Sequence, residues 1–243
     1  MKPNALFMFQ DFLRAAELLR AAILAKVRYL MLTGDSGTGK TTLMSHVQQL
    51  LDRCVFRIIY LHFACLNGYG LVRVLARHFR VPTRRSPPET VQALTAVIEA
   101  DPCFTLVWID EADILPDDIF AELRALVEND LAGATRLCVL VAGLPTLRDR
   151  LQAPHLFPFW RRIQSRLEIT GLRADEARAF ATHHLGPKNE VRLSDEAIAF
   201  LFEKSRGIPG LLIPYLDCVA REVPKGPIDV EATKAIVQRW DLA

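Results

Sequence analysis

One segment restricts the fold of this chain more than any other, the glycine-rich octapeptide GDSGTGKT at residues 34–41. It matches the Walker A pattern Gly-x-x-x-x-Gly-Lys-Ser/Thr without departure, between an apolar run ending at Thr33 and a helical pattern beginning near Lys40. Glycines let the backbone turn tightly and point its N–H groups inward, and the following helix adds the positive end of its dipole. Because strand and helix are both in place, a chance glycine-rich turn is a poor alternative. The sequence predicts a loop that binds the phosphates of ATP.

The side chains of this loop have separate predicted roles. Lys40 is expected to reach the β- and γ-phosphates. The Thr41 hydroxyl is expected to ligate Mg²⁺, because this ion takes few protein oxygens and keeps waters and phosphates. The residues predicted to bind the nucleotide are Gly34, Asp35, Ser36, Gly37, Thr38, Gly39, Lys40, Thr41 and Thr42.

A second segment, LVWIDEAD at residues 106–113, has the form of a Walker B segment, an apolar strand that ends in consecutive acidic residues. In that position Asp110 would hold Mg²⁺ through its waters, and Glu111 would polarise the attacking water as a general base. These two roles predict hydrolysis of ATP. The alternative is a strand that runs into an acidic helix cap. We expect Asp113 and the acidic pair at 117–118 to be capping residues.

Short apolar runs alternate with amphipathic patterns over the first two thirds of the chain, as in a parallel sheet covered by helices on both faces. Runs that are apolar and partly β-branched or aromatic predict buried strands at residues 29–33, 57–63, 105–109 and 137–142. Three- and four-residue apolar spacing predicts helices at residues 41–51, 69–79, 89–100 and 117–129. This is the α/β pattern of a P-loop NTPase.

Beyond about residue 171 the strand signals stop and only helical periodicity remains. Ser194 and Asp229 are good N-caps. Helices are predicted at residues 175–185, 194–205, 211–222 and 229–240. We therefore predict an α/β nucleotide-binding domain at residues 1–171, followed by a small all-helical lid domain at residues 172–243.

The composition, 51% hydrophobic and 24% charged residues in a chain of 243, is that of a globular protein with one substantial core. No uncharged apolar run is long enough to span a bilayer, and the N-terminus lacks the pattern of a secretory signal. We therefore expect a cytoplasmic location and no membrane partner. Scattered cysteines without a Cys-x-x-Cys pair agree with this compartment, and we expect them to be small buried hydrophobes. They are Cys54, Cys65, Cys103, Cys138 and Cys218.

The charge balance neither requires nor excludes a polyanionic partner. The net charge is +2 and the pI is about 8.3, and only the arrangement of charge can steer a partner. Arginines are nevertheless concentrated in two stretches, one with Arg73, Arg77, Arg80, Arg84 and Arg85 and the other with Arg148, Arg150, Arg161, Arg162 and Arg166. The first stretch enters residues 80–89, whose three prolines predict a mobile loop.

With these motifs the chain resembles the AAA+ ATPases of the ExeA and TnsC type, a group of general-secretion ATPases and transposition regulators related to MuB and TniB. The resemblance spans nearly the whole chain and rests on LTGDSGTGKTTL, LVWIDEAD, LVAGLPTLRDRL, RRIQSRLEITGL and FLFEKSRGIPGLL. The first two segments are general to P-loop enzymes. The last three, in this order, are more specific, and they resemble a sensor-1 strand, an arginine-finger segment and a sensor-2 helix.

The resemblance implies a ring or helical filament in which ATP sits between subunits and an arginine of one subunit completes the site of the next. Arg162 and Arg166 lie where such a finger is expected, and one of them is a better candidate than both. A guanidinium there would neutralise charge on the γ-phosphoryl group, which no residue in cis obviously supplies. The alternative is a solvated, basic helix face. Pro209 of the sensor-2 segment is expected to lie against the nucleotide.

Two positions depart from the pattern of the relatives. Leu144 stands where they usually carry a polar sensor-1 residue, often Gln. Gly210 stands where they often carry an arginine after Gly-x-Pro. We therefore expect the Walker A loop and the neighbouring subunit to hold the nucleotide, with hydrolysis slow enough to act as a timer.

Several functions are compatible with this resemblance. The first is a transposition regulator that polymerises with ATP on double-stranded DNA and recruits a transposase, with phosphate contacts from Arg73, Arg77, Arg84 and Arg85. The alternative for these arginines is an outward helix face. The second function is ExeA-like secretion assembly on protein partners. Such proteins typically add a membrane span and a wall-binding domain, and the end of this chain at Ala243 makes the DNA function our expectation. A non-hydrolysing switch and a replication or chaperone role are further alternatives.

Overall fold

The computed structural model describes residues 6–62, 69–128, 136–186, 193–222 and 227–241. The chain divides into two compact units. The sheet unit comprises Ala16–Gly34 and Lys40–Glu168, and the helical unit comprises Asp35–Gly39, the chain up to Ala15 and the chain from Ile169 onward. The middle of the glycine-rich loop therefore belongs to the helical unit, whereas both ends of the loop belong to the sheet unit.

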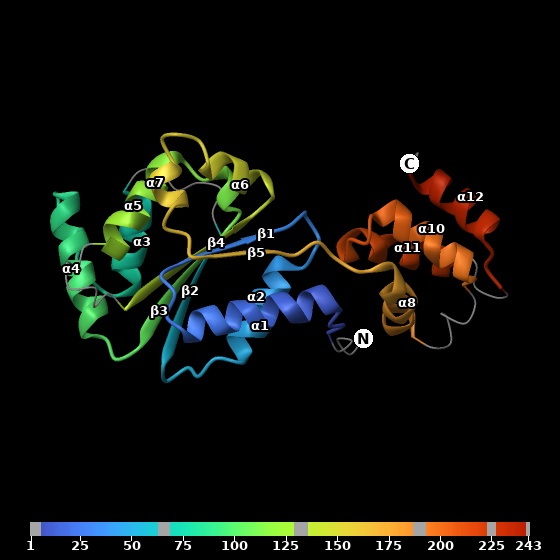
Figure 1. Cartoon of the computed structure of the whole chain (residues 1–243), viewed down its shortest axis with the longest axis horizontal. Coiled ribbons are helices and arrows are strands. Elements are labelled where there is room, and N and C mark those ends of the chain that lie inside the picture. The colour runs from blue at the N-terminus through green and yellow to red at the C-terminus, as the bar shows by residue number, and fades with distance from the viewer. Residues whose placement is uncertain (1–5, 63–68, 129–135, 187–192, 223–226, 242–243) are drawn as a thin grey trace. The chain divides into compact units, whose positions relative to one another are not determined.

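The sheet unit is built on a parallel five-stranded sheet with the order β2-β3-β4-β1-β5 (Figure 1). The strands are β1 (Tyr29–Thr33), β2 (Phe56–His62), β3 (Phe104–Asp110), β4 (Leu137–Gly143) and β5 (Ser165–Glu168). β1, β3 and β4 are buried along their whole length, which explains their nearly continuous apolar sequences. The four predicted strands are present, but the prediction that all of them are buried is wrong for β2, which lies at the edge of the sheet and exposes Tyr60 and His62. Phe63, the predicted end of this strand, lies outside the described residues. β5 is a further strand that was not predicted.

Helices cover the sheet on both faces, as the alternating pattern predicts. In Figure 1, α2 lies on one side of the sheet and α3, α4 and α5 lie on the other. The elements are α1 (Gln10–Leu24), α2 (Lys40–Gln49), α3 (Gly70–His78), α4 (Pro87–Ala100), η1 (Ala112–Ile114), α5 (Asp117–Glu128), α6 (Thr146–Leu151) and α7 (Phe157–Trp160). Asn129, the predicted end of α5, lies outside the described residues. α1, α6 and α7 were not predicted.

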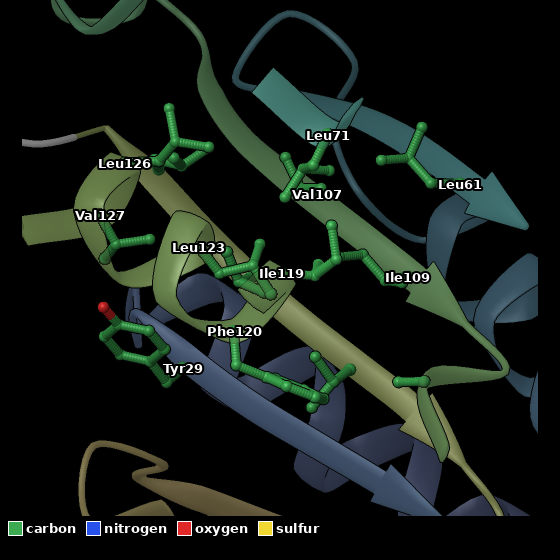
Figure 2. Close-up of a cluster of buried hydrophobic side chains, with 14 of the residues drawn as sticks. Tyr29, Leu61, Leu71, Val107, Ile109, Ile119, Phe120, Leu123, Leu126 and Val127 are labelled. Atoms are coloured by element: carbon green, nitrogen blue, oxygen red, sulfur yellow. The ribbon is translucent and has the colours of Figure 1, made fainter. Parts of the chain in front are cut away.

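A large apolar core lies between the sheet and the helices α3 to α5. Val107 of β3 belongs to it together with Ile119 and Phe120 of α5, as Figure 2 shows. Tyr29 closes one end of this core, and its hydroxyl donates to a carboxylate oxygen of Glu128 at 3.0 Å. Burial and this carboxylate raise the pKa of Tyr29. This contact ties the end of α5 to β1.

The predicted mobile loop at residues 80–89 is wrong in its last part. α4 begins at Pro87, so the final three residues of that segment are helical. Proline suits the first helical turn because the N–H that it lacks would have no partner within the helix there. Two consecutive prolines therefore mark a helix start here rather than a loop.

The expectation that the cysteines are buried hydrophobes is wrong for two of them. Cys54 is exposed and Cys103 is partly exposed, whereas Cys138 and Cys218 are buried. Both exceptions lie in turns before a strand, where each backbone N–H donates to the side chain of the aspartate two residues earlier. Cys65 lies outside the described residues.

The helical unit contains η2 (Ala174–Glu176), α8 (Ala177–Leu185), α10 (Asp195–Ser205), α11 (Pro209–Glu222) and α12 (Val230–Asp241). Both predicted caps are confirmed. The Ser194 hydroxyl accepts the N–H of Ala197 at 3.1 Å, and the Asp229 carboxylate accepts the N–H of Ala232 at 2.8 Å. Within the described ranges, no helix is long and apolar enough to cross a membrane. That residues 172–243 form a domain of their own stays a prediction.

Candidate nucleotide-binding site

The glycine-rich loop adopts a conformation that its glycines make accessible. Gly37 and Gly39 have φ angles of +85° and +99°, in the left-handed region that other residues rarely enter. Between them the buried Thr38 donates its hydroxyl to the carbonyl oxygen of Asp35 at 2.8 Å, and its N–H to the same oxygen at 3.3 Å. The loop is therefore closed by its own main chain, as a phosphate-binding loop requires.

The first turn of α2 carries the two side chains that the motif assigns to phosphate and metal. The ammonium group of Lys40 donates to the carbonyl oxygen of Gly34 at 2.7 Å, so the side chain folds back along the loop. The Thr41 hydroxyl donates to a carboxylate oxygen of Asp110 at 2.9 Å. Both predicted metal-binding residues thus meet, although they come from separate motifs. Asp35, Ser36 and Thr42 are exposed members of the same segment.

The Thr41–Asp110 pair fits a Mg²⁺ site. Both side chains offer hard oxygen ligands, and Mg²⁺ is usually held by one or two such groups together with waters and phosphates. Asp110 is only 5% exposed, and within the described part of the chain no lysine or arginine pairs with it, so a cation would neutralise a buried charge. The described residues hold no cluster of three or more His, Cys, Asp or Glu side chains that could bind a metal.

Glu111 differs sharply from its neighbour Asp110. Its backbone is in the left-handed region, with φ +54° and ψ +38°, and its N–H donates to a carboxylate oxygen of Asp110 at 3.1 Å. For a residue other than glycine this conformation costs roughly 1–2 kcal/mol, and such strain often marks functional sites. The turn leaves Asp110 buried, whereas the Glu111 side chain is 50% exposed. One carboxylate is therefore enclosed and the other can reach a water molecule.

Two residues of β2 contact the acidic residues at this edge of the sheet, and no local pattern in the sequence indicates either contact. His62, whose Cα pairs with that of Asp110, places its Nε2 3.8 Å from a carboxylate oxygen of Glu111. The Tyr60 hydroxyl donates to the other carboxylate, that of Asp110, at 3.3 Å. Burial and this carboxylate raise the pKa of Tyr60. Strand pairing between β2 and β3 would have been needed to foresee either contact.

The expected sensor-1 position lies just after β4. Leu144 donates its backbone N–H to a side-chain oxygen of Asp113 at 3.0 Å. A Cβ on the preceding Gly143 would lie 2.5 Å from that same oxygen and 3.1 Å from the Asp113 backbone nitrogen, so a larger residue there would have to displace this contact. Our expectation that Asp113 caps a helix is wrong, because this carboxylate joins η1 to the end of β4.

The two candidate arginine fingers lie in different elements. Arg162 follows α7, donates its Nε–H to the carboxylate of Glu128 and donates another N–H to the carbonyl oxygen of Pro158 at 2.7 Å. Arg166 lies on the edge strand β5, with its guanidinium 3.9 Å from the centroid of the Trp160 ring. The alternative of a basic helix face is therefore wrong. Arg162 is held by a carboxylate of its own chain, whereas Arg166 is exposed and rests on an aromatic ring.

Within the helical unit, the start of α11 meets the glycine-rich loop. The N–H of Gly210 donates to the carbonyl oxygen of Gly37 at 3.0 Å. A Cβ on Gly210 would lie 2.7 Å from the Cα of Gly37, closer than real Cβ atoms come. Pro209, which we expected beside the nucleotide, is the first residue of α11 and directly precedes this contact. The contact explains why position 210 carries no side chain.

Replacing Gly210 with alanine should weaken ATP binding. The added methyl group must push the loop or α11 aside, and overpacking of this kind costs about 1–3 kcal/mol. We expect the dissociation constant for ATP, measured by calorimetry, to rise about tenfold or more. Leu211→Ala, on the exposed neighbouring position, should bind ATP as the parent chain does. Equal affinities for all three proteins would show that the loop and α11 do not touch in solution.

Comparison with proteins of known sequence places these features in a family. The sequence profile described as an AAA domain matches residues 26–151, which is more than half of the chain. General secretion pathway protein A of Aeromonas hydrophila is 26% identical over 192 residues, covering 76% of this chain and 35% of that protein. Human replication factor C subunit 4 is 25% identical over 195 residues, covering 79% of this chain and 49% of that protein. The chain thus spans a third to a half of these relatives.

Solved structures share the fold at low sequence identity. The Aeropyrum pernix ORC1 protein, solved in complex with DNA, matches with a TM-score of 0.64 and 18% identity, over 98% of this chain and 66% of that one. The Thermotoga maritima RuvB Holliday junction branch migration motor matches with a TM-score of 0.62 and 19% identity, over 98% of this chain and 72% of that one. These similarities support the parallel sheet with flanking helices as a P-loop NTPase fold.

Motif, geometry and family agree on the chemistry. Lys40 donates to the Gly34 carbonyl oxygen and Thr41 meets Asp110, as the two Walker motifs lead one to expect, and their roles toward phosphate and metal stay predictions. Glu111, next to Asp110, carries an exposed carboxylate, and its role as the base stays a prediction. The chain belongs to the AAA domain family, and it is a P-loop ATPase that uses ATP and Mg²⁺.

Proposed function

We propose that this ATPase assembles with ATP on double-stranded DNA of any sequence and, in that form, recruits a transposase and target-selection proteins. The observation that carries the proposal is a set of four exposed arginines on α3 and the segment after it, Arg73, Arg77, Arg84 and Arg85. Across the described ranges of the chain, none of the four forms an ion pair with a carboxylate. Unpaired guanidinium groups suit the phosphate backbone, which is bound without reading base sequence.

Assembly is part of this proposal because one subunit carries little net charge. A net charge of +2 gives a weak field around a single chain. Subunits linked along one polymer add their phosphate contacts, so that weak contacts become a strong and cooperative association. Binding of ATP between neighbouring subunits would make this assembly depend on the nucleotide.

Each site residue has a role in the proposed hydrolysis. The loop from Gly34 to Thr42 binds the phosphates with its N–H groups, and Lys40 binds the β- and γ-phosphates. Thr41 and Asp110 would hold Mg²⁺, which would supply positive charge to the phosphates when bound. Glu111 orients the attacking water and accepts its proton.

We assign the trans finger to Arg166. Because the carboxylate of Glu128 engages Arg162, moving Arg162 to a neighbour would break this ion pair and leave the half-buried carboxylate with the more distant Arg124 guanidinium, at 3.8 Å. Arg166→Ala should therefore lower ATP turnover by about 10³-fold, as loss of such a finger does elsewhere, without lowering the melting temperature. Arg162→Ala should instead lower the melting temperature, by about 2–4 °C per kcal/mol lost.

A mixing experiment tests whether this finger acts between subunits. Arg166→Ala chains keep an intact loop, whereas Lys40→Ala chains keep the finger, so a mixture should recover part of the ATP turnover that each variant lacks. A turnover that stays at the sum of the two separate variants, at every mixing ratio, would place Arg166 outside the neighbouring site.

The DNA part of the proposal is tested by fluorescence anisotropy on two unrelated duplexes across a salt series, with and without a slowly hydrolysed ATP analogue. Binding should be cooperative, should require nucleotide and should weaken steeply with salt. Arg84→Ala with Arg85→Ala should weaken both duplexes equally and flatten the salt slope by about 2. The control variant, Arg20→Ala with Arg53→Ala, removes the same charge from exposed positions elsewhere. Its affinity for both duplexes and its salt slope should stay close to those of the parent chain.

The second candidate is an ATPase of secretion assembly that acts on protein partners. It is favoured by the 26% identity to General secretion pathway protein A of Aeromonas hydrophila over 76% of this chain. If neither duplex binds at low salt with nucleotide present, the DNA function is wrong and this protein-directed function takes its place.

A further inference from the structure

Arg73 and Arg77 differ from the other two arginines of the basic set because they line a cavity. The cavity has a volume of about 430 Å³ and is lined by Arg73, Val74, Arg77, Val81 and Thr83. Its size falls within the range of small-molecule sites, about 300–1,000 Å³. All of its lining residues belong to the sheet unit, so its shape depends on that unit alone.

A reversal of the chain after α3 builds this cavity. The helix ends at His78 with Phe79 as its C-cap, and Arg80 adopts φ +57°, which turns the chain back along the helix. The N–H of Val81 then donates to the carbonyl oxygen of Ala76 at 2.7 Å. Val81 is only 8% exposed and anchors this return in the apolar core. Thr83, two residues further on, is thereby brought beside the last two turns of α3.

Among the described residues that line the cavity, the two charged groups are the guanidinium groups of Arg73 and Arg77. Arg73 and Arg77 are one helical turn apart, and the Arg73 guanidinium lies 5.5 Å from the centroid of the Tyr69 ring. Neither arginine has an ion-pair partner in the described segments. The nearby end of α3 is its C-terminal end, which carries the negative end of the helix dipole. An anion in the cavity would therefore depend on the two side chains and not on the helix.

We propose that this cavity binds one phosphate group, at a site separate from the glycine-rich loop. Two guanidinium groups match the oxygens of a phosphate with paired N–H donors, and the Thr83 hydroxyl adds a third donor. Val74 and Val81 supply the apolar part of the lining. The phosphate comes from the backbone of duplex DNA or from a free polyphosphate or nucleotide. Only the DNA source rests on the proposed function above.

The test uses the full chain with Lys40→Ala, which removes the main cation of the other phosphate site. Calorimetric titration with tripolyphosphate measures the free source, and anisotropy with a duplex and nucleotide, in chains with Lys40 intact, measures the DNA source. Arg73→Ala with Arg77→Ala should raise the dissociation constant of whichever source binds, tripolyphosphate or duplex, at least tenfold. Thr83→Val should weaken it less, because one neutral donor is lost while the shape is kept. Arg73→Lys with Arg77→Lys should give an intermediate loss, since lysine keeps the charge but not the paired donors.

Arg84→Ala with Arg85→Ala is the matched control, since it removes the same charge from the same stretch outside the cavity. It should leave tripolyphosphate binding unchanged, and a thermal melt of each variant checks that the chain remains folded. If only tripolyphosphate binding responds to the cavity variants, the source is a free phosphoanion. If no chain binds the duplex while the cavity variants still weaken tripolyphosphate binding, the phosphate site is supported and the DNA function is wrong.

Two results would overturn the proposal. In the first, the Arg73 and Arg77 variants bind tripolyphosphate and the duplex with the same affinities as the Arg84 and Arg85 control. The cavity would then contribute no more to binding than the rest of the basic surface. The other is that a short glutamate peptide competes as well as tripolyphosphate, because the cavity is then a carboxylate site.

Discussion

Replacing Lys40 with alanine should nearly abolish ATP binding. Its ammonium is the side-chain cation that the motif directs to the β- and γ-phosphates, and it already folds back along the loop at 2.7 Å from the Gly34 carbonyl oxygen. Hydrogen bonds to charged groups contribute about 1.5–3 kcal/mol each, so the loss of two should raise the dissociation constant by roughly 10²-fold or more.

Calorimetry with ATP and Mg²⁺ measures this effect. The control is Lys204→Ala, which removes the same charge from an exposed position at the end of α10 and should leave the affinity unchanged. If Lys40→Ala binds ATP as tightly as the control, the loop is not the phosphate-binding element.

Changing Glu111 to glutamine should separate ATP binding from hydrolysis. Glutamine keeps the size of the side chain but cannot accept the proton of the attacking water, and a positioned base contributes about 10²–10⁴-fold to a rate. Turnover should therefore fall by about 10²-fold or more, while the dissociation constant for ATP changes little because Glu111 is not expected to touch the phosphates.

Steady-state phosphate release, measured beside calorimetry, follows both quantities. Glu17→Gln, an exposed site on α1, is the matched control and should keep the parental rate. Undiminished turnover in Glu111→Gln would assign the base to another residue near this strand end. A parallel loss of affinity and turnover would instead indicate a collapsed site.

The fold was predictable where sequence pattern and burial coincide. β3 and β4 are central parallel strands buried on both faces, so their sequences are continuous apolar runs that any reader detects. β5 has four residues at the edge of the sheet and buries only Leu167 fully, which leaves no pattern. α6 and α7 are similarly too short for helical periodicity to emerge. Length and burial, rather than the type of element, decided what could be foreseen.

The site was predictable to the extent that its parts are local in sequence. The glycine-rich loop is one contiguous motif, and its geometry follows from glycine positions alone. The contact between His62 and Glu111 depends on strand pairing, which no local pattern encodes. The approach of Gly210 to Gly37 likewise joins distant segments, although the missing arginine at position 210 marked it as unusual. The departure from the motif at position 210 was visible in the sequence, but its cause, the close approach to Gly37, is visible only in the structure.

Electron microscopy of the purified chain tests the central claim most directly. The protein would be imaged with Mg²⁺ and a slowly hydrolysed ATP analogue, with and without a duplex, and Lys40→Ala would serve as the control. The account predicts rings or filaments on the duplex when nucleotide is present, and dispersed particles for Lys40→Ala under the same conditions. Dispersed particles of the parent chain in every condition would contradict it.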